Sequence, residues 1–148
     1  SRRSDVMSGW QITQQYAQML IAAGRTAEAI DELLAAIDGV RSLGIRQPAT
    51  QLQVILARAH ADSDPGRAAD LAGEAVTAAR DGQFLLLEGQ ALTVLAVALR
   101  RLGRDAEAIA AAKEALGVHE QTGHEPGREE TAALLAELEG ADRTGAPE

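Results

Sequence analysis

One pattern recurs along this chain and limits what it can fold into: a helical segment, a short break at a glycine and a second helical segment. Residues 88–120 show the pattern most clearly. Apolar residues recur there at the spacing of one helical face, first at Leu92, Leu95, Ala96, Leu99 and Leu102, then at Ala108, Ile109, Ala112, Ala115 and Leu116. The break between the two sets is so short that it predicts two helices packed antiparallel as a hairpin.

The break lies at Gly103, Arg104 and Asp105. Glycine can adopt the left-handed conformation that ends a helix, and the Asp105 carboxylate can accept hydrogen bonds from the free amides of the next helix. The sequence therefore predicts a turn. Glycines are predicted to cap the second helices of the hairpins in the same way, at Gly44, Gly82 and Gly123.

A single hairpin leaves its outer apolar stripe uncovered, so further copies are expected to stack on it. Residues 9–44 match the pattern closely, with helices predicted at about 9–23 and 27–42. A weaker copy spans residues 48–82, where Asp64 is predicted to cap the helix that begins at Pro65. The third copy covers residues 84–123, and residues 126–139 are predicted to be a capping helix.

The sequence also predicts the state of the two ends of the chain and which residues of the first two helices are buried. Residues 1–8 are predicted to be a flank, and residues 140–148 a mobile tail because they lack apolar residues. The first helix is expected to bury Trp10, Ile12, Tyr16 and Leu20, and the second to bury Ile30, Leu33, Leu34, Ile37 and Val40.

Composition restricts the class of protein. The 148 residues, of which 46% are hydrophobic, suit one domain. A formal charge of -8 and 2% aromatic residues argue against direct binding of nucleic acid. The chain lacks cysteine and any apolar run of the roughly 20 residues that span a bilayer, so no membrane association is expected and a cytoplasmic location is predicted. Since the chain opens with Ser1, we expect it to be part of a larger protein.

Sequence motifs for catalysis, nucleotide binding or metal binding are weak or absent. His119 and His124 are five residues apart, whereas paired zinc ligands on one helix need a spacing of four, and Gly123 is expected to end the helix between them. The sequence has no phosphate-binding loop, dinucleotide fingerprint or serine elbow. We therefore predict no catalytic residues, no metal, no cofactor and no enzymatic activity.

The repeated residues resemble the tetratricopeptide repeat, whose consensus has a small residue in the first helix, a glycine at the turn and alanines in the second helix. Those roles fall here to Ala17, Leu56 and Ala96, to Gly24 and Gly103, and to Ala29, Ala68, Ala108, Ala36, Ala75 and Ala115. The period is nearer 40 than the 34 residues of the consensus, and the middle copy has Leu56 at the small position. The resemblance implies an all-α, right-handed superhelix of hairpins with a C-terminal capping helix.

In that family the first helices line a concave groove. The matching positions here carry mainly amides and hydroxyls, at Gln11, Gln14, Gln18, Thr50, Gln53, His60, Gln90, Thr93, Val97 and Arg100. Such groups can donate to and accept from a peptide backbone without the desolvation of a full charge, so a segment of a partner protein is a fitting occupant. The alternative is that these positions only face solvent, since glutamine is a good helix former.

The composition and the run from His119 to Leu138 are also similar to the sensor repeats at the C-terminal end of actinobacterial signal-transduction ATPases and transcriptional regulators. This likeness implies a non-enzymatic interaction or sensor module whose partner is a protein, a peptide or another domain of the parent chain. A second hypothesis is a homodimer formed through the ends of the stack, by Val6, Met7 and Trp10 or by the outer side of the last helix.

Overall fold

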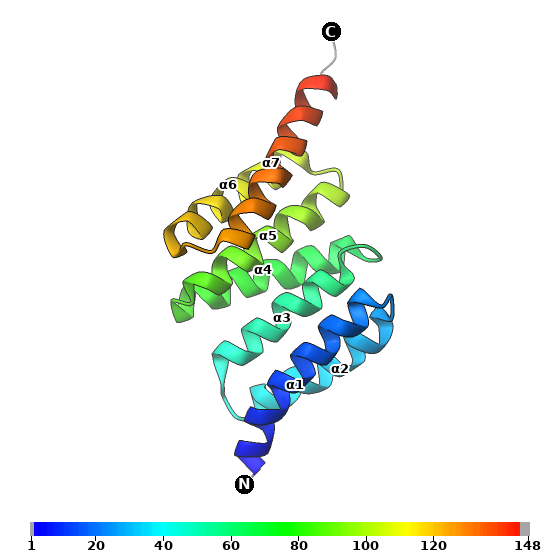
Figure 1. Cartoon of the computed structure of the whole chain (residues 1–148), viewed down its shortest axis with the longest axis vertical. Coiled ribbons are helices and arrows are strands. Elements are labelled where there is room, and N and C mark those ends of the chain that lie inside the picture. The colour runs from blue at the N-terminus through cyan, green and yellow to red at the C-terminus, as the bar shows by residue number, and fades with distance from the viewer. Residues whose placement is uncertain (1, 146–148) are drawn as a thin grey trace.

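The computed structural model describes the backbone of residues 2–145 and the side chains of residues 9–140. These residues form an all-α structure, as the sequence predicts (Figure 1). The helices are α1 (Arg2–Ala22), α2 (Thr26–Ser42), α3 (Arg46–His60), α4 (Pro65–Gly82), α5 (Leu85–Arg101), α6 (Asp105–Thr122) and α7 (Glu125–Gly145).

The helices form two layers. Each helix packs against the next one along the chain, and α1, α3, α5 and α7 also contact one another in sequence. The even-numbered helices make no comparable contacts with each other within the described residues. The stack is therefore tighter on the side of the odd-numbered helices, which in Figure 1 run side by side from α1 near the N-terminus to α7 near the C-terminus.

The turn inside the first and third hairpins is the one that the glycine pattern predicts. Gly24 and Gly103 have φ angles of 80° and 77°, a left-handed conformation that favours glycine. The predicted cap at Asp105 is wrong, because Asp105 is already inside α6 and Arg104 takes the cap position. Arg104 instead binds Glu107 through two hydrogen bonds of 2.5 and 2.8 Å.

The second helices end as predicted at two of three sites. Gly44 and Gly123 have φ angles of 71° and 72°. The prediction for Gly82 is wrong by one residue, because Gln83 is the left-handed residue, with φ of 61°. Gly82 instead leaves room for the Phe84 ring, since a methyl group on its Cα would lie 2.5 Å from the Cε2 atom of Phe84.

Both ends of the helical region are longer than predicted. Helix α1 begins at Arg2, inside the predicted flank, and α7 runs to Gly145, into the predicted tail; residues 1 and 146–148 lie outside the described residues. The turn of the middle copy is confirmed. There, the Asp64 side chain accepts a hydrogen bond from the backbone N–H of Arg67, and Pro65 is the first residue of α4.

The core contains several of the predicted residues and excludes others. Ala17, Leu20, Leu33, Ile37 and Val40 are buried in one cluster that extends to α5 and α6, with Trp10 and Ile30 partly buried against it. The predictions for Ile12, Tyr16 and Leu34 are wrong, because these side chains are exposed. In α1 the buried stripe follows Trp10, Ala17 and Leu20, and Ile12 lies on a different side of the helix.

No helix in the described part of the chain is long and apolar enough to cross a membrane.

Candidate functional site

A hollow of about 230 Å³ lies on the side of the odd-numbered helices, and we call it the glutamine hollow. Part of its lining consists of amide side chains from three helices, namely Gln14 and Gln18 of α1, Gln51 of α3 and Gln90 of α5. The rest of the lining comes from Val54, Ile55 and Arg58 of α3, Thr93 of α5, His119 of α6, the turn residue His124, and Pro126, Gly127 and Glu130 of α7.

Two glutamines of the hollow join neighbouring hairpins. The Nε2 atom of Gln51 donates a hydrogen bond of 3.0 Å to the Oε1 atom of Gln14. The bond leaves the amide nitrogen of Gln14 and the carbonyl oxygen of Gln51 available, among the described residues, to a further partner. The pair therefore offers a donor from α1 beside an acceptor from α3.

Two shallower hollows adjoin the first and share its glutamines. One has a volume of about 360 Å³ and includes Gln11, Gln14 and Gln51. The other, of about 280 Å³, runs between Gln47, Gln51 and Gln90 and the start of α5. Gln51 lines all three hollows, so amide side chains recur across α1, α3 and α5, although the hollow at the start of α5 is also lined by the apolar residues 84–87.

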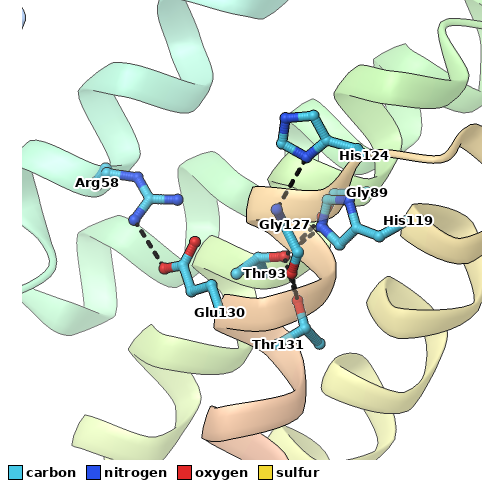
Figure 2. Close-up of polar contacts among 8 residues, drawn as sticks. All are labelled: Arg58, Gly89, Thr93, His119, His124, Gly127, Glu130 and Thr131. Atoms are coloured by element: carbon cyan, nitrogen blue, oxygen red, sulfur yellow. Dashed lines mark hydrogen bonds and ion pairs between the residues drawn. The ribbon is translucent and has the colours of Figure 1, made fainter.

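The charged side chains of the glutamine hollow neutralise each other. The Nη1 atom of Arg58 on α3 lies 3.2 Å from the Oε2 atom of Glu130 on α7, as Figure 2 shows. Helices α3 and α7 are not in direct backbone contact, and the ion pair spans the space above α5 between them. Since both side chains are nearly half exposed, the ion pair can open at a cost of no more than about 1 kcal/mol.

The floor of the hollow is a buried polar cluster from three helices (Figure 2). The Nε2 atom of His119 lies 3.0 Å from the Oγ1 atom of Thr93, which lies 3.3 Å from the Oγ1 atom of Thr131. Each threonine hydroxyl also donates to a carbonyl one turn earlier in its own helix, Thr93 to Gly89 at 2.9 Å and Thr131 to Gly127 at 2.7 Å. The cluster therefore ties α6 to α5 and α7.

Two glycines make room for the His119 ring. A methyl group on the Cα of Gly127 would lie 2.5 Å from His119 Nδ1, and one on Gly89 would lie 3.0 Å from the same atom. A side chain at either position would therefore force the His119 ring to shift. Glycine followed four residues later by threonine thus occurs at matching places on α5 and α7, and His119 lies between the two pairs.

Burial dominates the electrostatics of His119. The side chain is 1% exposed, and burial followed by the nearby His124 lowers its pKa below the ordinary 6.5, against smaller opposing effects of Glu130 and the Gly89 carbonyl. The two imidazole ring centres are 5.3 Å apart. His124 has its own partner, since its Nδ1 atom accepts a hydrogen bond of 3.0 Å from the backbone N–H of Gly127.

The structure places two predicted groove residues elsewhere. Gln53 is buried between helices, where it accepts a hydrogen bond of 2.5 Å from Arg41 and donates one of 3.0 Å to the Leu71 carbonyl. Thr50 is also buried and donates to the Arg46 carbonyl at 3.0 Å. The predicted positions on α3 are wrong by one residue, which turns a side chain by about 100° from the hollow into the interior.

The other predicted groove residues divide into two sets. Gln14, Gln18, Gln90 and Thr93 line the glutamine hollow, and Gln11 lines the adjoining one. His60, Val97 and Arg100 line none of these three hollows. Val97 packs on apolar clusters, Arg100 forms an ion pair with Glu137, and burial lowers the pKa of His60.

Sequence reasoning missed Gln51, Arg58 and His119 as parts of one site. Gln51 becomes visible in the sequence if the middle copy is aligned with the third at a period of 39 instead of 40, since this pairs Gln51 with Gln90. The sequence pattern around His119 bears only on metal binding and does not indicate this site. Within the described residues, no group of three or more His, Asp or Glu side chains is placed to hold a metal ion.

Neither a protein-family model nor any curated protein matches this chain.

Proposed function

We propose that this chain is a tetratricopeptide-like interaction module that binds an extended segment of a partner protein along the glutamine hollow. The observation that carries the proposal is the row of amide side chains, Gln14, Gln51 and Gln90, contributed by three successive first helices. A right-handed superhelix of the tetratricopeptide type is part of the same proposal, and the tighter packing on the odd-numbered side supports it.

The chemistry of the row suits a peptide backbone. A primary amide carries the same donor and acceptor groups as a peptide unit, and the Gln14–Gln51 pair shows that the two side chains already bond to each other as amides do. A peptide N–H and C=O can add to the free ends of that pair. Because the groups involved are neutral, the desolvation cost of binding is modest.

The charges of the hollow favour a partner segment that is itself uncharged. Arg58 and Glu130 satisfy each other, and burial keeps His119 neutral by lowering its pKa. A charged side chain entering the hollow would have to displace one member of the ion pair or remain without a counter-ion. We therefore expect the part of the partner inside the hollow to be a neutral stretch of main chain.

The likeness to sensor repeats of actinobacterial regulators suggests where such a partner would come from. On this proposal the occupant is a segment of another regulator protein or of another domain of the parent chain, and its binding restrains or releases an effector. The module itself acts in the cytoplasm and carries out no chemical reaction.

The test is a matched pair of charge variants in affinity capture followed by mass spectrometry. Gln14, Gln51 and Gln90 are changed together to Glu, which leaves the helices intact but places three carboxylates in the hollow. The control carries the same added charge on α4 and α6, through Thr77→Glu, Ala110→Glu and Gln121→Glu, at exposed positions outside the hollow.

The proposal predicts that a partner held by the unchanged chain is also held by the control and lost by the hollow variant. Circular dichroism must show equal helix content for both variants. A partner that the hollow variant retains would refute binding in the glutamine hollow.

A second candidate function is self-association through α1. Ile12, Tyr16 and Met19 are exposed at successive turns of one side of this helix, which is unusual for apolar residues at this spacing. Trp10 is partly buried against the core and is a poorer candidate than predicted, while the side chains of Val6 and Met7 lie outside the described residues.

Sedimentation velocity separates this candidate from a monomeric binder. If α1 pairs copies, Ile12→Ser with Met19→Ser should convert a dimer to a monomer, whereas Leu34→Ser, at an exposed residue on α2, should leave the dimer unchanged. A dimer that survives the α1 substitutions would contradict this interface.

A further inference from the structure

His119 is the one buried imidazole of the described residues, and its protons can be assigned from its neighbours. The hydroxyl of Thr93 donates to the Gly89 carbonyl, and that of Thr131 donates to the Gly127 carbonyl. Thr93 Oγ1 therefore accepts from His119, which places the proton of the neutral ring on Nε2. The Nδ1 atom is left without a proton.

That Nδ1 atom is buried and has no hydrogen-bond partner within the described part of the chain. Its surroundings are the backbones of Gly89 and Gly127, which approach so closely that a single methyl group on either would touch the ring. A second proton on the ring would have to go to Nδ1. The cost of a buried charge without a partner would then oppose the packed arrangement.

The charged groups around the ring do not remove that cost. From α7, the Glu130 carboxylate favours a protonated ring, but Arg58 of α3 pairs with it at 3.2 Å. His124, in the turn before α7, disfavours a protonated His119 ring. Helix α5 presents no charged side chain to the ring, and the Gly89 carbonyl favours the protonated ring less than burial disfavours it. Helix α6 adds Glu120, next to His119 in sequence and with an exposed side chain.

We infer that His119 is a pH-sensitive latch: as a neutral ring it holds α7 on α5 and α6, and on protonation it releases α7 from the stack. Helix α7 is suited to separate release, because in the described structure its backbone packs only on α6 and α5. The released state exposes His119 to water, where the ring takes up its second proton without penalty.

The sign of the effect follows from the proton balance. Burial lowers the pKa of His119 in the docked state below 6.5, the ordinary value to which it returns when the ring is exposed. The released state therefore binds more protons than the docked state below about pH 6.5. Docking is complete above that pH and weakens as the pH falls, by up to about tenfold in the opening equilibrium per pH unit for one proton.

This latch would also act on the glutamine hollow, since His124, Pro126, Gly127 and Glu130 form its wall at α7. That consequence for binding rests on the proposed function, whereas the latch itself does not. The test below contains no partner, so its failure and a failure of the proposed function are distinguishable.

The experiment is an NMR titration of the chain from pH 7.5 to pH 5, combined with hydrogen exchange. The sequence contains three histidines, whose ring signals can be assigned with His60→Gln and His124→Gln. We expect the His119 signal to titrate with a midpoint below 6.5. Below about pH 6.5, amide protection in α7, corrected for the intrinsic exchange rate, should fall by up to about tenfold per pH unit, while protection in α3 and α4 is kept.

The variant His119→Gln can still donate a hydrogen bond to Thr93 but does not titrate, so in it the protection of α7 should no longer depend on pH. Should this variant fail to fold, the titration of the unchanged chain still decides. A His119 midpoint at or above 6.5, or α7 protection that is the same at pH 7.5 and pH 5, would overturn the latch.

Discussion

Gln51 of α3 donates a 3.0 Å hydrogen bond to Gln14 of α1, across a gap of 37 residues in the sequence. The bond links two hairpins on the face where the glutamine hollow lies, whereas Gln53, two residues further along α3, is buried among α2, α3 and α4. Two glutamines on one helix thus have different roles: one lines a surface, and the other holds the interior together.

This difference predicts unequal effects of truncation. Gln53→Ala should lower the free energy of unfolding by about 1 to 3 kcal/mol, because it opens a cavity and removes the bonds to Arg41 and Leu71. Gln51→Ala should change it by less than about 0.5 kcal/mol, since its side chain borders solvent. Urea denaturation measures both, and equal losses would contradict the assignment of Gln53 to the interior.

A second prediction concerns the space that Gly127 gives to His119. Gly127→Ala places a methyl group 2.5 Å from Nδ1 of His119 and should destabilise the chain by about 1 to 3 kcal/mol through overpacking.

The matched control is Gly117→Ala in α6, where a methyl group meets nothing within 4 Å. Alanine favours a helix, so this variant should gain about 0.5 to 1 kcal/mol. Thermal unfolding of the two variants should therefore shift in opposite directions, and a tolerated Gly127→Ala would argue against the close packing of α7 on His119.

A third prediction follows from the conformation of Gln83. Its φ of 61° is one that glycine adopts without strain, so Gln83→Gly should raise stability by about 0.5 to 1 kcal/mol. The reverse change at the equivalent cap, Gly123→Gln with φ of 72°, should cost about 1 kcal/mol. A loss of stability in Gln83→Gly would show that contacts of the glutamine side chain outweigh the backbone strain.

Much of the fold could be predicted because it depends on local rules. Helical periodicity, the glycines at 24, 44, 103 and 123, and the cap at Asp64 each act within a few residues of the chain, and the structure confirms them. The predicted ends of α1 and α7 lie too far inward because the residues there are polar, and polarity alone does not end a helix.

Which residues line the glutamine hollow depends on contacts between helices that are far apart in the sequence. A shift of one residue in the middle copy puts Thr50 and Gln53 in the places that Gln51 and Val54 take in the structure. No local signal in α3 fixes that register, because polar residues occur on both sides of the helix. Likewise, Ile12 and Tyr16 share a helical spacing with buried residues, and only the packing of α2 and α3 on α1 decides which side is covered.

Binding of a partner in the glutamine hollow can be followed directly through the side-chain amides that line it. Once a partner segment has been captured, a ¹⁵N-labelled sample of this chain should be titrated with it and the glutamine side-chain NH₂ signals followed by NMR. We expect shifts at Gln14, Gln18, Gln51 and Gln90 and none at Gln121, an exposed residue of α6 outside the hollow. Unchanged signals from the four hollow glutamines in the presence of a bound partner would contradict binding in the hollow.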